Sequence, residues 1–540
     1  MNEELNRAFE QISDEHIIEA AVYQRQRFPW LRAIAAVLAL VIAWTAIWAS
    51  LDFPPTIFFP TEPRPTVTGG PKPEYPSNLQ GIQSPATLQL ANLVAGPMYP
   101  QMVQHPGSTE ADPHSDEYYH ILNQWYDGLN AQYNQPDGYA DSLKGFWGRS
   151  IAQFLSGEGN RAYSPATVYM AMAMLAETTG GNSRQQILDL LGAESIEALR
   201  TQAGHVWNAQ YCDDGESISL LANSLWLDEA YRFKDPAVQN LVNHYYTSIF
   251  NGDLGTEEMN EQLRTWLNSQ TGGLLQDRAK ELELSEYAVF ALASTIYFAA
   301  GWENEFSPDK TADGIFHCED GDLTTPFMNQ SIQFGTYYRG SNFGAVRLNM
   351  SKGGMWLILP DEGVTVEEVL AGDEYLTMTL NPHQWTNKNI VKINLSLPKF
   401  DISSQADLID GMKKLGLSDV FNPHISDFTP MTDADQLAVG KIDHAVRVAI
   451  DEEGVVAAAY TVIEIKDTGA PMPRGMRSTL FLTVLSCSWS PTTFPSSPAW
   501  WNSHKYLKTH NIPGAFRSGD VTIHYKIRTH TSWRCSRAAR

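Results

Sequence analysis

An apolar segment of nineteen residues, from Ala33 to Leu51, constrains this chain more than any other feature. It holds no charged side chain, and a helix of this length, at about 1.5 Å per residue, is just long enough to cross the hydrocarbon core of a bilayer. Three arginines lie within the eight residues before it, and Asp52 follows it. Because cationic residues favour the cytoplasmic side, we expect residues 1–32 in the cytoplasm and the chain after residue 51 outside the cell.

Two other interpretations of this segment are weaker. A cleaved signal peptide has a shorter charged lead and a small-x-small cleavage site, which Ile47-Trp48-Ala49 does not provide. A buried helix of a soluble domain leaves the flanking charges unexplained. We therefore predict an uncleaved signal-anchor, with one transmembrane helix over residues 33–51 and a membrane-anchored, single-pass protein whose C-terminal domain is extracellular.

A proline-rich stretch follows the apolar segment. Residues 52–107 contain twelve prolines, and proline breaks the interiors of helices and sheets. Such a sequence favours an extended, semi-rigid chain. We expect residues 52–117 to be an extracytoplasmic linker that holds the folded part, residues 118–503, away from the membrane.

Charge and composition exclude several classes of function. The net charge is −24, whereas a nucleic-acid partner requires a basic surface, so no nucleic acid is expected. The sequence has no G-x-S-x-G, no H-E-x-x-H and no glycine-rich phosphate loop, so we expect no enzyme, no metal and no cofactor. Four cysteines are present without a C-x-x-C pair; Cys212 and Cys318 form either a disulfide or two free thiols, and we favour the thiols.

The folded part mixes helical and strand patterns. Ser164 and Pro165 open an apolar run that stops at Gly180-Gly181, and these residue types are typical of helix starts and ends. Strand-like runs follow, among them ISLLANSLWL, AVFALASTIYF and IVKINLSLPKF, without a regular βαβ alternation. This arrangement predicts an α+β domain with large, mainly antiparallel sheets.

Several short motifs occur in a fixed order over about 360 residues. They are Asn160-Arg-Ala-Tyr-Ser164-Pro165, the run from Thr295 to Phe306 with Trp302 inside it, Leu397-Pro398-Lys399-Phe400, Leu415-Gly416-Leu417, Asp427-Phe428, His444-Ala445 and Asp451-Glu452-Glu453-Gly454 followed by Val455 to Ala459. Together they resemble the serpin family of serine protease inhibitors, in a bacterial-type, membrane-anchored form.

The resemblance implies a fold and an activity. The fold has three β-sheets, eight or nine α-helices and an exposed reactive-centre loop, here at about residues 452–473. The implied activity is inhibition of a serine-type endopeptidase, with a cysteine-type one as the alternative, by a suicide mechanism in which the protease cuts the loop and the loop inserts into the central sheet. A non-inhibitory carrier or folding helper with the same fold is the alternative.

The segment after Gly454 suits such an insertion, because successive strand residues face opposite sides. The side expected to be buried carries Val455, Ala457, Ala459 and Thr461, and the side expected to face out carries Val456, Ala458 and Tyr460. No charge occurs between Gly454 and Ile463, as burial requires. The hinge implied by the resemblance consists of Glu452, Glu453, Gly454, Val455, Val456, Ala457, Ala458 and Ala459, and Gly454 gives it backbone freedom.

Family spacing from Glu452 places the cleaved bond at Thr468-Gly469. A small residue such as Thr468 in the protease pocket suggests an elastase-like or subtilisin-like target, whereas Lys466 in that place suggests a trypsin-like one. The resemblance also implies a polar group beneath the opening sheet, called the shutter in this family. Its residues are Ser164, Thr167, Ser294 and His444, where Ser294 replaces the usual asparagine and has less reach.

The C-terminal end differs in composition from the rest. Residues 474–540 hold ten lysines or arginines and one acidic residue, Asp520. When the reading frame is shifted by two bases across the possible codons of Leu482 to Ser490, the sequence Asp-Arg-Pro-Phe-Leu-Phe-Val-Val becomes possible. This sequence resembles the family's terminal strands, which are missing here. We therefore hypothesise a frameshift between about Pro473 and Leu482, which makes residues 504–540 an aberrant basic tail; a divergent natural tail is the alternative.

Overall fold

The structure is a computed structural model, and it describes residues 90–469 except for residues 98, 101, 110, 113, 134–138, 158, 319 and 320. The expected cytoplasmic segment, the expected membrane helix at residues 33–51 and the tail beyond residue 469 lie outside the described residues. Within the described part, no helix combines the length and the apolar character needed to span a bilayer.

Eleven α-helices occur in the described part of the chain, where eight or nine were expected. They are α4 (Asp116–Tyr133), α5 (Tyr139–Leu155), α6 (Pro165–Thr178), α7 (Gly181–Leu191), α8 (Ile196–Gln210), α9 (Asp235–Tyr245), α10 (Glu257–Gln270), α11 (Gln276–Ala279), α12 (Val366–Ala371), α13 (Glu374–Leu380) and α14 (Ile409–Lys414). The start of α6 follows the predicted signal, because Ser164 Oγ accepts a hydrogen bond from the backbone N–H of Thr167 and Pro165 occupies the first turn.

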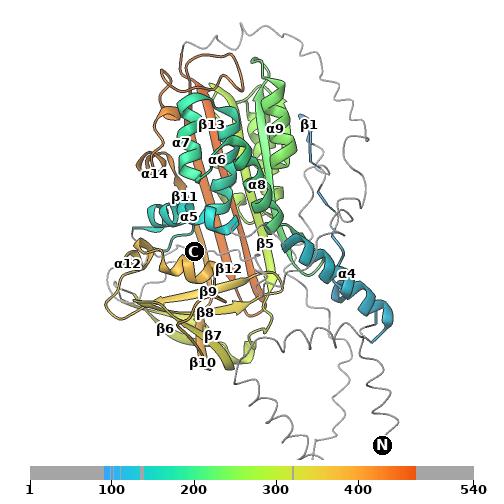
Figure 1. Ribbon diagram of the computed structural model, residues 1–540, viewed down its shortest axis with the longest axis vertical. Coiled ribbons are helices and arrows are strands. Elements are labelled where there is room, and N and C mark those ends of the chain that lie inside the picture. Colours follow the sequence, from blue (N-terminus) through green and yellow to red (C-terminus); the bar gives the residue numbers. More distant parts are fainter. Residues whose placement is uncertain are drawn as a thin grey trace, which may run out of the picture. The chain divides into compact units, whose positions relative to one another are not determined.

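A large central sheet contains eight strands. Its order is β1 (Leu93–Ala95), β4 (Thr247–Gly252), β3 (Ile218–Asp228), β5 (Ala288–Gly301), β13 (Gly454–Asp467), β12 (Leu437–Ile450) and β11 (Phe400–Asp407), with β2 (Cys212–Asp213) beside β3. Among the strands that the structure describes in this sheet, β3 and β4 alone pair in parallel, and the other pairs are antiparallel. The strands β5, β13 and β12 run side by side through the middle of the sheet (Figure 1).

The second sheet has five strands. Its order is β10 (Lys388–Pro398), β7 (Gly321–Arg339), β8 (Phe343–Asn349) and β9 (Gly354–Pro360), and β6 (Ala312–Cys318) pairs with β7. The fold therefore has two sheets in the described residues rather than the expected three. The reason is β7, whose nineteen residues pair with β6 and β10 over most of its length and with β8 at its C-terminal end.

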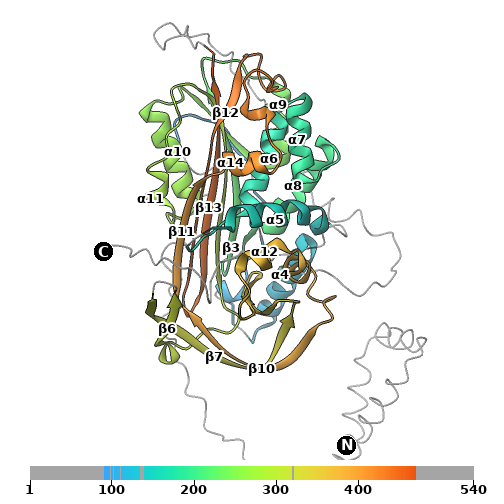
Figure 2. The same ribbon diagram turned by 90° about the vertical axis from the view of Figure 1, so that its left-hand side faces the viewer.

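Helices cover both faces of the central sheet (Figure 2). On one face, α6 is buried almost completely and packs into a core that includes Ile463 and Ile465 of β13. On the other face, Leu263 and Trp266 of α10 belong to a core that includes Tyr460 and Val462. The middle of the sheet therefore has no water-exposed face over most of its length.

The expected reactive-centre loop is not exposed in this structure over most of its length. Residues 454–467 form strand β13, with β5 on one side and β12 on the other. The two described residues that follow β13, Thr468 and Gly469, are exposed. The physical reason is that apolar side chains on both faces favour the covered interior of the sheet, where β5 and β12 supply hydrogen-bond partners for the backbone.

Candidate functional site

Strand β13 is paired along its whole length. It forms thirteen residue pairs with β12, from Val455 opposite Ile450 to Asp467 opposite Leu437, and thirteen with β5. This register puts every residue of the predicted hinge from Gly454 to Ala459 inside the sheet. It also sets which side chains of the neighbouring strands the inserted residues meet.

Both faces of β13 are buried, which corrects the expected division into a buried and an outer side. Val455, Ala457 and Ala459 lie in one apolar cluster, as predicted. On the opposite face, Ala458 and Tyr460 are also buried, since α10 and its connections cover them, and only Val456 of the expected outer set is half-buried. Because α10 covers the second face of β13, the side chains on both faces must be free of unpaired charge.

Three of the four predicted shutter residues, Ser164, Thr167 and His444, belong to one hydrogen-bond network that includes Thr461 of β13. His444 Nε2 accepts a hydrogen bond from the backbone N–H of Ser164 at 3.2 Å, so the ring proton of the neutral imidazole lies on Nδ1. That nitrogen lies 2.9 Å from Thr461 Oγ1 and donates to it. The Thr461 hydroxyl donates in turn to Thr167 Oγ1 at 3.1 Å.

This chain of hydrogen bonds joins β12, β13 and the start of α6. His444 is fully enclosed, and burial lowers its pKa to about 3, so it stays neutral at physiological pH. The family resemblance implied His444, Ser164 and Thr167 as members of the shutter and did not include Thr461. The alternation of β13 places Thr461 on the correct face, but only the register shows that it meets His444.

Ser294, the fourth predicted shutter residue, does not join this network. It lies on β5 opposite Thr461 and is buried. Its hydroxyl finds no hydrogen-bond partner among the residues that the structure describes. The shorter reach of serine relative to asparagine agrees with this isolation.

The N-terminal end of β13 is held by several side chains. Glu452 forms an ion pair with Lys399 at 2.6 Å and accepts a hydrogen bond from Thr311 at 2.7 Å. Trp302 donates from its indole nitrogen to the carbonyl of Asp451 at 2.8 Å. These contacts fix the point at which the chain turns from β12 into β13.

Gly454 is required here for a reason other than the expected flexibility. A Cβ atom at this position would lie 2.3 Å from the carbonyl oxygen of Ala300 on β5. Its φ is not among the left-handed values of the described glycines. Close approach of two backbones, and not an unusual torsion, explains the glycine in this state.

The C-terminal end of β13 is held by backbone and hydroxyl contacts. Asp467 donates its N–H to the carbonyl of Tyr287 at 3.0 Å, and Thr468 donates from its N–H and its hydroxyl to the carbonyl of Gln436. Thr468 and Gly469 are exposed, whereas Lys466 is half-buried within the strand. The two candidate positions for the protease pocket therefore differ in accessibility in this state.

A second polar contact crosses the sheet on the α10 side. The hydroxyl of Tyr460 donates to Asp443 Oδ2 at 3.0 Å, and Gln405 donates to Asp443 Oδ1 at 3.1 Å. Burial raises the pKa of both Asp443 and Tyr460. This group ties β11, β12 and β13 together, and sequence reasoning missed it because its three members come from three strands, 17 and 38 residues apart along the chain.

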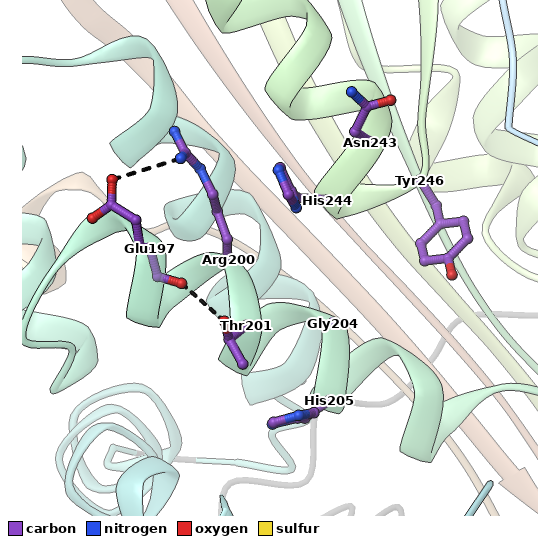
Figure 3. A pocket seen from close by; sticks show the side chains of 8 residues that line it. All are labelled: Glu197, Arg200, Thr201, Gly204, His205, Asn243, His244 and Tyr246. Atoms are coloured by element: carbon purple, nitrogen blue, oxygen red, sulfur yellow. Dashed lines mark hydrogen bonds and ion pairs between the residues drawn. The ribbon is translucent and has the colours of Figure 1, made fainter. Parts of the chain in front are cut away.

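Other features do not form a second site. A pocket of about 390 Å³ lies between α8 and α9 (Figure 3), but its Arg200 is paired with the buried Glu177 at 2.6 Å and burial lowers the pKa of His205 and His244. Among the described residues, no group of three or more His, Cys, Asp or Glu is arranged to hold a metal ion.

Cys212 is a free, buried thiol, so the disulfide alternative is not formed.

Comparison with known proteins identifies the family. The family model described as Serpin (serine protease inhibitor) matches residues 149–478, more than half of the chain. Alpha-1-antiproteinase 2 of Equus caballus is 28% identical over 320 residues, covering 58% of this chain and 74% of the relative. The chain therefore belongs to the serpin family, whose members are generally protease inhibitors rather than enzymes.

Solved structures agree with the fold. The thermophilic serpin tengpin in the latent state has a TM-score of 0.56 at 23% identity and covers 62% of this chain and 90% of its own. Cleaved kallistatin complexed with heparin has a TM-score of 0.56 at 24% identity, with 61% and 98% covered. The predicted serpin fold is confirmed.

Proposed function

We propose that this protein inhibits a serine-type endopeptidase as a suicide substrate, and that strand β13 is the end state of its reactive loop. The observation that carries the proposal is the residue content of β13. From Gly454 to Ile463 it holds no charge, and it fills the centre of the sheet with small or apolar side chains on both faces. A loop that never entered the sheet would have no need of such a sequence.

The energy for trapping a protease comes from the added ladder. With β13 expelled, β5 and β12 would close on each other and form one ladder; with β13 inserted, they form two. The gain is one ladder of thirteen residue pairs, and at about 1 kcal/mol net for each hydrogen bond it is on the order of 10 kcal/mol. That is comparable to the whole stability of a typical domain, about 5–15 kcal/mol.

The proposed cleaved bond is Thr468-Gly469. Fourteen residues of inserted strand end immediately before it, so a protease bound covalently at Thr468 would be carried to the far end of the sheet. The small side chain of Thr468 favours an elastase-like or subtilisin-like target, and a trypsin-like target applies if Lys466 is the residue bound in the pocket.

The proposed location is the outer side of a bacterial-type membrane, with the helix at residues 33–51 as anchor and the proline-rich residues before β1 as spacer; the later part of the expected linker contributes β1 to the central sheet and the start of α4. The charge pattern around residues 33–51 supports this arrangement. An epitope placed before residue 33 and another placed in the folded part test it: only the second is accessible to antibody on intact cells if the proposal holds.

We also propose that the reading frame shifts between about Pro473 and Leu482. The match to the family model ends at residue 478, inside that interval, and this supports the proposal. Resequencing the gene tests it. An undisturbed frame with no two-base offset match would identify residues 504–540 as a natural tail.

The experiment for inhibition uses the full-length chain in detergent, in the frame that resequencing gives. It is mixed with elastase-, subtilisin- and trypsin-like proteases, and complexes that survive SDS are scored by gel electrophoresis. The proposal requires one such complex, with the cut after Thr468 or Lys466. Cleavage in this loop without any complex would instead support the non-inhibitory carrier or folding helper.

A further inference from the structure

Glu464 is an exception to the apolar character of β13. It lies on the α10 side of the strand, in step with Ala458, Tyr460 and Val462, and is only 3% exposed. Removing a carboxylate from water is costly unless hydrogen-bond donors replace the water. The strand nevertheless continues through Glu464 to Asp467, so the sheet must supply those donors.

Ser285 supplies both of them. Its backbone N–H donates to Glu464 Oε2 at 2.9 Å, and its hydroxyl donates to Glu464 Oε1 at 3.0 Å. Each carboxylate oxygen therefore has a donor from the same residue. Hydrogen bonds to an ionised group are stronger than those between neutral groups.

The position of Ser285 is fixed by groups outside β13. The preceding backbone N–H, of Leu284, donates to the buried side chain of Asn260 on α10 at 2.8 Å. Gly255, with φ +78°, lies so close that a Cβ there would stand 2.4 Å from the carbonyl oxygen of Ser285. These two contacts of the segment around Ser285 involve no residue of β13.

No cation competes for Glu464 among the described residues. Lys441 is its partner in the register on β12, but the Lys441 ammonium donates to the carbonyl of Glu283 at 2.6 Å. Two residues beyond Ser285, the carbonyl of Tyr287 accepts the N–H of Asp467. The segment 285–287 thus receives the end of β13 at two points.

We infer that Ser285 is a docking site for the Glu464 carboxylate and that the pair positions the last third of the loop during insertion. The inference rests on the proposed function. With the loop expelled, Glu464 lies in water and the Ser285 donors stay free of it; the contact forms only after the strand has paired as far as Ile463. It then holds the strand four residues before the proposed cleaved bond.

The test is a double-mutant cycle on the full-length chain, in the frame that resequencing gives. Glu464→Gln, Ser285→Ala and the double variant are compared with the parent, and Tm is measured before and after a single cut in the loop. Each single variant should lower the Tm of the cut form by about 2–4 °C and leave the uncut form unchanged. Ser285→Ala removes the hydroxyl donor and keeps the backbone N–H, so the double variant should lose clearly less than the sum of the two single losses, because both single variants disturb the same hydroxyl contact.

Two further variants separate docking from general damage. Ser285→Thr keeps both donors and should restore the Tm of the parent, whereas Glu464→Asp is one methylene shorter and should behave like Glu464→Gln. Glu283→Gln, a change at an exposed glutamate on the same segment, is the matched control and should have no effect.

The outcomes separate a failure of the docking pair from a failure of the proposed function. Equal losses in cut and uncut forms, additive losses in the double variant, or an unchanged Tm for Glu464→Gln would each overturn the docking pair. If cutting does not raise the Tm of the parent itself, the proposed function fails and the docking pair with it.

Discussion

Replacing Ala459 by glutamate is expected to turn the inhibitor into a simple substrate. Ala459 is 1% exposed in the middle of β13, opposite Val446 on β12 and Ile296 on β5. All three belong to one apolar cluster. A carboxylate there would lie among apolar side chains, whereas Glu464 receives two donors from Ser285.

The magnitude follows from the register. If insertion halts before Ala459, nine of the thirteen pairs with β12 are never formed, which forfeits on the order of 9 kcal/mol at about 1 kcal/mol each. If insertion proceeds, an unpaired charge is buried at a cost of several kcal/mol. Because about 1.4 kcal/mol is a factor of ten, either route should lower the yield of trapped protease more than tenfold.

The assay is the ratio of SDS-resistant complex to cleaved product, measured with the protease that the parent traps. Val456→Glu is the matched control, with the same charge on the same strand but at a half-buried position on the other face. It should lower the ratio less than Ala459→Glu. An Ala459→Glu chain that cuts at the normal rate and still traps protease in the parental ratio would refute the reasoning.

Three further predictions follow from single residues of the site. Burial lowers the pKa of His444 from an ordinary 6.5 to about 3, so between these pH values the unfolded chain binds one proton more than the folded chain. The stability of the inserted form is therefore complete above pH 6.5 and falls toward pH 3 by up to about 1.4 kcal/mol per pH unit. His444→Gln should remove this contribution and flatten the pH profile of stability measured on the cut form. Gly454→Ala should lower the Tm of the cut form, because its Cβ meets the carbonyl of Ala300 at 2.3 Å, and an unchanged Tm would show that the backbone yields there. Thr468→Arg should move complex formation to a trypsin-like protease, and trapping that stays with the original protease would place the cleaved bond elsewhere.

Much of the fold was predictable because its signals are local. The cap formed by Ser164 and Pro165 marks the start of α6, and the glycines at 180 and 181 mark its end. The order of short motifs led to the serpin fold, and two-residue alternation put Val455, Ala457 and Ala459 on one face of the inserted strand. Each of these inferences needs only residues near one another in the chain.

The state of the loop and the polar contacts were not predictable in the same way. Residues 454–467 suit both an exposed loop and a central strand, so their sequence alone does not say which is occupied. Thr461 meets His444, and Tyr460 meets Asp443, only because β13 and β12 pair in one register out of several. The charge-free run ends at Ile463, yet the strand continues through Glu464, because Ser285, far away in sequence, donates to its carboxylate.

The central claim is that residues 455–466 leave the surface and become an interior strand after a protease cuts the chain. Amide hydrogen exchange of this segment, followed by mass spectrometry before and after one cut in the loop, tests it most directly. The account predicts fast exchange in the uncut, protease-sensitive protein and protection by several orders of magnitude after the cut. Equal exchange rates in the two forms would contradict it.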